Sequence, residues 1–145
     1  MKKTFFLLLF VYLASCSTVP MTGRKQLVAI PSSQMIALSD ESYAQVLEEN
    51  RLSTNTGYVN MVRTVGERLS SAVEQYMKQN GMSSAVENYD WKFNVLVSEE
   101  LNAWCMPGGQ IAFYEGIMPV CEDENGVAVV MGHDIAHAVA QHGNE

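Results

Sequence analysis

Two histidines and an aspartate near the end of the chain are the residues whose types and spacing point most directly to chemistry. They occur in the segment Gly132-His133-Asp134-Ile135-Ala136-His137. If this segment is helical, a spacing of four residues places His133 and His137 on one face, about 6 Å apart along the helix axis. Two imidazoles in that arrangement can share a tetrahedral Zn²⁺ ion. The sequence therefore predicts a metal site here, with a structural pair of histidines as the alternative.

The residues around the histidines predict a long, buried helix. The stretch from Val127 to His142 has a helical pattern, and Glu122-Asp123-Glu124 before it suits the positive end of a helix dipole. Because the stretch is apolar on nearly every side, it is expected to be buried. Two histidines and an aspartate are costly in such a setting unless they bind something. His142 lies about 180° around the helix from His133 and is expected to be exposed or to cap the helix end.

The elements that must position this helix are two core-packing helices and a small sheet. The first helix is expected to begin with Ser32 or Ser33 as its N-cap and to run to about Arg51. Apolar residues at three- and four-residue spacing predict a second helix, and alternating β-rich residues predict two strands. The expected bounds are about Tyr58 to Lys78 for the helix, ended by Asn80-Gly81, and Trp91 to Val97 and Gln110 to Tyr114 for the strands, with a tight turn at Gly108-Gly109.

Three stretches of the sequence resemble one group of peptidases. VVMGHDIAHAVAQHGNE resembles the active-site helix of the HtpX/BepA/Oma zinc metallopeptidases, peptidase family M48, whose usual motif is HExxH. NAWCMPGGQIAFYEGIM resembles the family's NAxxxPGGxIxxxxGI segment, and TVPMTGRKQLVAIPSSQM resembles the tether of its bacterial lipoprotein members. The resemblance implies an α+β, gluzincin-like fold in which N-terminal helices and a small sheet or hairpin precede a buried active-site helix.

The resemblance also implies roles for individual residues. His133 and His137 match the two zinc-binding histidines, and Asp134 stands at the position of the catalytic Glu, which activates water. The segments Asn102-Ala103 and Pro107-Gly108-Gly109 match the part of the family that borders the cleft. By analogy, extended backbone there can hold a substrate peptide as an added strand. A hairpin without a binding role is the alternative.

Two features depart from the family pattern. Asp134 is one methylene shorter than Glu, and a misplacement of about 1 Å can cost about 100-fold in rate. The family takes its third zinc ligand, a Glu, from a later helix, whereas the sequence stops at Glu145, which is not expected to be that ligand. Residues 32–145 are therefore expected to be the N-terminal portion of a metallopeptidase domain, truncated before its zinc site is complete.

The first fifteen residues are expected to be a lipoprotein signal peptide. Two lysines precede the apolar run Phe5–Leu13, which is far shorter than the roughly 20 residues that span a bilayer. Leu13-Ala14-Ser15-Cys16 resembles the bacterial lipobox, which implies acylation of Cys16; a plain secretory signal is the alternative. Residues 16–31 then form a tether. Ser17 favours the outer membrane of a bacterial envelope, with the protein facing the periplasm.

Composition narrows the classes of function. The net charge is −7 and Lys and Arg are not clustered, which argues against nucleic-acid binding. The expected partners are a protein or peptide substrate and, through the lipid anchor, a membrane. The expected function is zinc-dependent proteolysis of envelope proteins, impaired by Asp134 and the truncation. The alternative is a non-catalytic envelope lipoprotein, a pseudopeptidase that acts as a binding or chaperone-like module.

Two cysteines remain once Cys16 is assigned to acylation. Cys105 and Cys121 could form a disulfide in an oxidising envelope. Two buried free thiols are the alternative, because sequence does not show how far apart the two Cα atoms lie.

Overall fold

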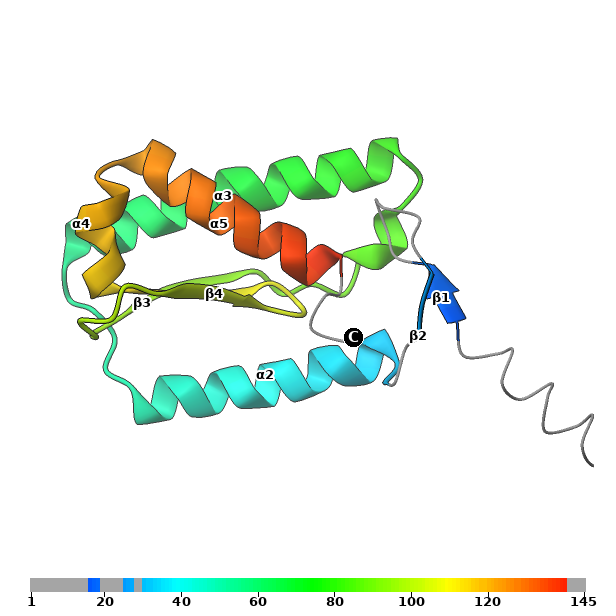
Figure 1. Ribbon diagram of the computed structural model, residues 1–145, viewed down its shortest axis with the longest axis horizontal. Helices are drawn as coiled ribbons and strands as arrows, with labels where there is room; N and C mark the ends of the chain where they lie inside the picture. The colour runs from blue at the N-terminus through cyan, green and yellow to red at the C-terminus, as the bar shows by residue number, and fades with distance from the viewer. Residues whose placement is uncertain (1–15, 19–24, 28–29, 141–145) are drawn as a thin grey trace, which may run out of the picture.

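A three-stranded sheet lies between one long helix and a pair of helices in the computed structural model, which describes residues 16–18, 25–27 and 30–140 (Figure 1). Helix α2 (Ser32–Glu49) covers one face of the sheet, and helices α3 (Thr56–Gln79) and α5 (Glu124–Val139) cover the other. The α+β class expected from the sequence, with N-terminal helices and a small sheet before a C-terminal helix, is confirmed.

The sheet contains strands β3 (Lys92–Leu96), β4 (Ala103–Met106) and β5 (Gln110–Tyr114) in the order β3-β5-β4. The two strands expected from the sequence are confirmed, the first within one residue at each end. Strand β5 pairs in parallel with β3 and in antiparallel fashion with β4. The β4–β5 turn contains Gly108 at φ +102° and Gly109 at φ +90°, a backbone region that favours glycine, so the predicted tight turn is also confirmed.

Alternating side chains of β5 supply two separate cores. Ile111 and Phe113 pack toward α3 and α5, whereas Ala112 packs toward α2. On the α2 side, the Tyr43 hydroxyl donates a hydrogen bond to the Ile111 carbonyl at 3.0 Å and accepts one from the Asn94 amide at 2.9 Å. These bonds tie α2 to both parallel strands, because Asn94 belongs to β3.

The ends of α2 and α3 differ in how well the sequence predicts them. Asn55 caps α3 by accepting a hydrogen bond from the Tyr58 N–H, and Asn80 ends that helix before Gly81 at φ +69°. The predicted serine N-cap of α2 is wrong. Pro31 is the N-cap, and its carbonyl accepts the first helical hydrogen bond, so both serines lie inside the first turn.

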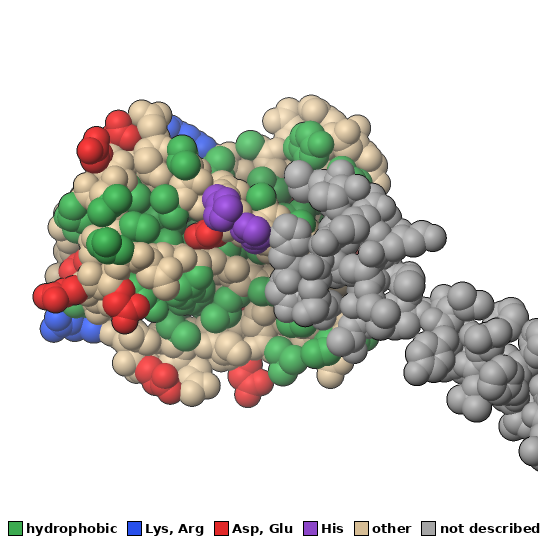
Figure 2. Space-filling view, viewed as in Figure 1, with side chains coloured by type: hydrophobic (Ala, Val, Ile, Leu, Met, Phe, Trp, Pro, Cys, Tyr) green, Lys and Arg blue, Asp and Glu red, His purple; other side chains and the backbone are tan. Residues whose placement is uncertain are grey.

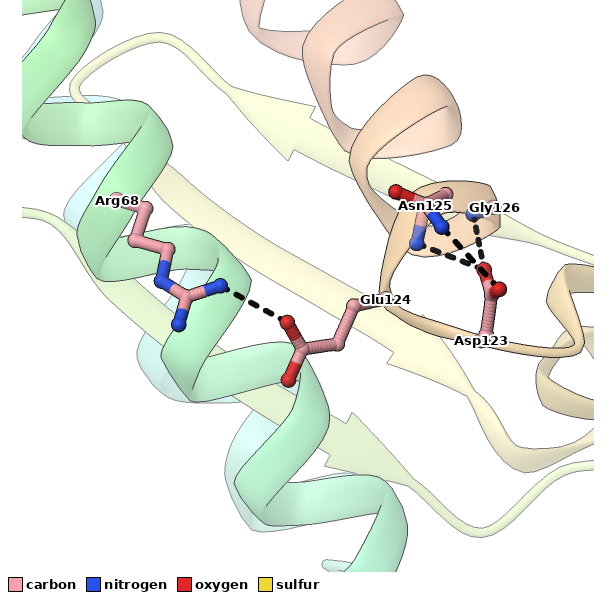
Figure 3. Close-up of polar contacts among 5 residues, drawn as sticks. All are labelled: Arg68, Asp123, Glu124, Asn125 and Gly126. Atoms are coloured by element: carbon pink, nitrogen blue, oxygen red, sulfur yellow. Dashed lines mark hydrogen bonds and ion pairs between the residues drawn. The ribbon is translucent and has the colours of Figure 1, made fainter.

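Helix α5 begins and ends about three residues earlier than expected. It begins after Asp123, whose carboxylate accepts hydrogen bonds from the backbone N–H groups of Asn125 and Gly126 (Figure 3). Glu124, the next residue, forms an ion pair of 2.9 Å with Arg68 of α3. The acidic start predicted for this helix is thus confirmed, and the carboxylates of Asp123 and Glu124 each have a defined contact.

The expectation that α5 is buried is confirmed for one side of the helix only. Five of its side chains are buried, namely Val127, Met131, Ile135, Ala138 and Val139. Val129 is 74% exposed, and both histidines are exposed as well. Helix α3 and strand β4 cover only part of the helix circumference, and an apolar sequence does not reveal which of its faces has a neighbour.

Smaller elements complete the described chain. The helix η1 (Ser83–Ala85) follows α3, and η2 (Glu115–Ile117) and α4 (Met118–Cys121) connect β5 to α5. In the segment expected to be a tether, β1 (Cys16–Thr18) pairs with β2 (Lys25–Leu27) in a small antiparallel sheet. Within the described residues, no helix combines the length and apolar character that crossing a membrane requires. The predicted signal peptide, His142 and Glu145 lie outside these residues.

Candidate active site

The two histidines of α5 lie side by side on the protein surface, where Figure 2 shows them in purple. The Nε2 atoms of His133 and His137 are 3.1 Å apart. Their rings meet edge to face, with centroids separated by 4.5 Å. The structure therefore brings together the pair that the sequence singled out, and leaves it open to solvent on the outer side of the helix.

The geometry of this pair fits two positions of a tetrahedral zinc ion. Two nitrogens bound to one such ion, each at about 2.0–2.1 Å, lie roughly 3.3 Å apart. The observed separation of 3.1 Å between the two Nε2 atoms is close to that value. Among the described residues, no cluster of three or more His, Cys, Asp or Glu side chains surrounds a common point. The described part of the chain thus offers two donors for a metal.

Asp134 is half-buried between the histidine pair and the sheet. Its Oδ2 atom is buried, and within the described residues it has no hydrogen-bond partner. Burial raises the pKa of the Asp134 carboxyl group, while the nearby His133 and His137 act in the opposite direction. A buried carboxylate oxygen without a donor is a costly arrangement in a protein that uses it only for structure. It fits a group that accepts a proton or a hydrogen bond from a bound molecule.

Both cysteines of the folded part are free thiols. The disulfide between Cys105 and Cys121 is therefore not formed, and the free-thiol alternative describes the structure, although Cys105 is only partly buried. Cys105 lies on the face of β4 toward α5. Burial raises the pKa of its thiol to about 12, and the negative charge of Asp134 adds to this effect.

The predicted cleft-bordering residues lie at the two ends of β4. Asn102 and Ala103 lead into the strand, and the Asn102 carbonyl accepts a hydrogen bond from the Tyr114 N–H. Pro107, Gly108 and Gly109 form the turn at the other end. Both glycines are buried in the turn, and a Cβ atom at position 109 would lie 2.7 Å from Trp91.

Strand β4 is the strand of the three-stranded sheet that the sequence prediction missed. Its residues Ala-Trp-Cys-Met are all apolar, so they lack the alternation by which the other strands were found. In an antiparallel pair, every second residue directs its N–H and C=O groups away from the partner strand. The bond between Tyr114 and Asn102 sets this alternation, so the backbone groups of Ala103 and Cys105 point to the outer edge. No group in the described ranges pairs with that edge.

Comparisons with known proteins agree with the motif in α5. Residues 64–145 match peptidase family M48. Mitochondrial metalloendopeptidase OMA1 from Schizosaccharomyces pombe is 25% identical over 134 residues, which are 92% of this chain and 37% of that protein. The metalloendopeptidase OMA1 proteins of Bos taurus and Homo sapiens are 28% and 30% identical, with 97% of this chain and 26% of each relative covered. The chain thus spans between about a quarter and somewhat over a third of these relatives. With the family match covering more than half of its residues, the chain belongs to peptidase family M48.

Proposed function

We propose that this protein is a zinc-dependent metalloendopeptidase that cleaves proteins or peptides. The observation that carries the proposal is the exposed pair of Nε2 atoms of His133 and His137, 3.1 Å apart, in a member of peptidase family M48. These two residues would hold the zinc ion. The metal supplies Lewis-acid activation of the scissile carbonyl group and of water.

Asp134 is the proposed general base. Its buried Oδ2 atom would receive the proton of the attacking water. The influence of its charge on Cys105 of β4 supports a position close to the strand at which we propose the substrate to lie. A base must come within about 2.6–3.2 Å of the proton that it takes. The shorter side chain of Asp limits this approach, so the cleavage rate is expected to be lower than it would be with Glu.

The open edge of β4 is the proposed binding place for the substrate backbone. The N–H and C=O groups of Ala103 and Cys105 that point outward can bond to an extended peptide, as in other complexes in which a strand is added to a sheet. An antiparallel peptide would form the more stable pairing. Such a strand would lie alongside α5 and below the histidine pair.

The proposed location is the bacterial cell envelope, with envelope proteins as substrates. Support comes from the leader sequence, in which Leu13-Ala14-Ser15-Cys16 follows a short apolar run. Acylation of Cys16 would attach the protein to a membrane, and Ser17 favours the outer membrane facing the periplasm. The relatives named above are mitochondrial proteins, so this assignment rests on the leader alone.

A non-catalytic binding or chaperone-like lipoprotein is the second candidate function, and Asp134 is the residue that favours it. A chain that retained the histidine pair and the β4 edge but lost an effective base would still bind zinc and extended peptides. It would release them without cleavage.

The decisive experiment measures cleavage of unfolded casein in the presence of zinc, with His142→Ala as the matched control for His133→Ala and His137→Ala. We expect slow cleavage that a chelator stops. His133→Ala and His137→Ala should each abolish this cleavage, whereas His142→Ala should retain it. Zinc-dependent peptide binding without cleavage, even with Asp134→Glu, would establish the non-catalytic alternative. A protein that neither binds zinc nor cleaves casein would refute both candidate functions.

A further inference from the structure

Three aliphatic side chains at one end of the candidate cleft are the most exposed large hydrophobic residues of the described chain. Leu101 is 69% exposed, Val120 64% and Val129 74%. We call these residues the apolar patch. Figure 2 shows hydrophobic side chains gathered over α4 and the first turns of α5, on the face that carries the histidines. Exposed apolar groups that cluster on a surface are a common feature of binding sites.

Several contacts place the members of the apolar patch at the same end of the sheet. Gly116 of η2 donates a hydrogen bond to the Ser98 carbonyl at 2.9 Å and packs against the backbone of Glu99 and Glu100, directly before Leu101. The chain continues from η2 into α4, which carries Val120. The backbone of Cys121, the last residue of α4, then packs against Gly126 in the first turn of α5.

The apolar patch lies beside the histidines along the direction of β4. Val129 and His133 are four residues apart, so they share one face of α5 and are separated by about 6 Å along its axis. Helix α5 runs in the same direction as β4. Its first turns lie near Leu101, and the Tyr89 hydroxyl near the opposite end of the sheet donates a hydrogen bond to the Ala138 carbonyl. Val129 is therefore on the Ala103 side of the histidine pair.

Acidic side chains surround the apolar patch. Glu99 and Glu100 precede Leu101, and Glu122 follows the helix that carries Val120; all three are exposed. Asp123 caps α5 and Glu124 is paired with Arg68, but no ion pair involves the other three glutamates among the described residues. This charge complements a basic residue, and it repels an acidic one at low salt.

We propose that the apolar patch and its glutamates select substrate peptides with an aliphatic residue next to a basic residue on the C-terminal side of the cleaved bond. The inference rests on the proposed function. A peptide antiparallel to β4 runs from the Met106 end toward the Ala103 end, so its C-terminal portion meets the apolar patch. The aliphatic side chain packs on Val129 and Leu101, and the basic side chain faces the glutamates.

The test measures binding of labelled peptides by fluorescence anisotropy, together with their cleavage. A peptide with Leu followed by Arg is compared with one that has Ser in place of Leu and one that has Glu in place of Arg. The unmodified protein should bind the first peptide about tenfold more tightly than the Ser peptide, the ratio expected for burial of an aliphatic side chain. Val129→Ser and Leu101→Ser should each reduce this ratio. Leu38→Ser, a substitution at an exposed leucine of α2 on the other side of the sheet, should preserve it.

Equal binding of the Leu and Ser peptides, or an unchanged ratio in both patch variants, would overturn the inference. The Glu peptide should bind more weakly than the Arg peptide, and this difference should shrink at high salt. Because binding is read without cleavage, the outcomes separate. Selective binding without cleavage would support the role of the apolar patch and contradict the proposed peptidase activity. Cleavage without selective binding would support the peptidase activity and contradict the role of the apolar patch.

Discussion

At the scale of single residues, Asp134 is the proposed base, and its length is expected to limit the rate of cleavage. Where a third ligand completes the zinc site, Asp134→Glu is expected to raise kcat/KM for peptide cleavage by up to about 100-fold, because the longer side chain brings the carboxylate nearer the water from which it takes a proton. Asp134→Asn should abolish cleavage and leave zinc affinity nearly unchanged, since this residue is not proposed as a ligand. A steady-state assay of the three proteins checks both expectations. A Glu variant slower than the natural Asp protein would contradict the assignment of the base.

The thiol of Cys105 gives a second test at this scale. Its pKa of about 12 exceeds the ordinary value of 9.0, so at pH 8 the folded protein should contain about 1000-fold less thiolate than an exposed cysteine. Iodoacetamide should therefore label Cys105 far more slowly in the folded protein than in urea, as mass spectrometry of a Cys16→Ser variant would show. Equal labelling rates in the two states would contradict the burial of this thiol.

The raised pKa of Cys105 also determines how the free energy of unfolding depends on pH. Because the folded pKa of Cys105 lies above the unfolded one, its contribution to the free energy of unfolding is complete below about pH 9 and is lost as the pH rises toward 12. Replacing Cys105 by Ala should flatten this alkaline loss.

At the scale of elements, two glycines in helices differ in the space around them: Gly66 is closely packed, whereas Gly132 is not. A Cβ atom at Gly66 would lie 2.3 Å from the Phe93 ring, whereas one at Gly132 would have no neighbour within 4 Å. Gly66→Ala should lower the free energy of unfolding by about 1–3 kcal/mol through overpacking between α3 and β3. Gly132→Ala should raise it by about 1 kcal/mol, because alanine has the higher helix propensity. Urea unfolding of both variants measures the contrast, and a destabilising Gly132→Ala would show that the space beside α5 is filled.

The sequence predicts the elements better than their arrangement. The spacing of apolar residues predicted α3, and alternation predicted β3 and β5, because these patterns follow from the helical and extended backbone periods. The order β3-β5-β4 could not be predicted, since no local pattern in Ala103–Met106 marks a strand or its partner. The exposure of α5 was also missed, because burial depends on neighbours from distant parts of the chain.

The candidate site also combines features that the sequence predicts with features that it does not predict. The pair His133 and His137 was predictable, because four-residue spacing on one helix fixes their separation without help from other elements. The outer edge of β4 and the exposure of Val129 depend on tertiary packing, and no local sequence pattern indicates either. Chemistry carried by one element was therefore accessible from the sequence, whereas chemistry formed between elements required the fold.

At the scale of the whole molecule, the layers formed by the described residues leave one face of α5 exposed, and no group among these residues pairs with the neighbouring outer edge of β4. Helix α2 and its hydrogen bonds from Tyr43 hold the far face of the sheet, so the proposed binding of a substrate at the β4 edge would leave that core undisturbed.

Acylation of Cys16 is the prediction at the scale of the whole molecule. Cells that produce the full chain in the presence of labelled palmitate should incorporate the label into this protein, and a Cys16→Ala variant should not. The natural chain should also be found in the membrane fraction and the variant in the soluble fraction, because acyl chains supply the hydrophobic anchor. Equal labelling of the two proteins would contradict the lipobox assignment.

The central claim is that His133 and His137 together hold a zinc ion. Isothermal titration with Zn²⁺ tests it most directly when the natural chain is compared with His133→Ala, His137→Ala and the control His142→Ala. We expect one zinc ion per chain. Either His133→Ala or His137→Ala should lower the zinc affinity at least about 100-fold, since loss of even an outer-shell partner costs about 10–100-fold. The control His142→Ala should leave the zinc affinity unchanged. Zinc binding that survives His133→Ala and His137→Ala, or that is lost with His142→Ala, would contradict the account.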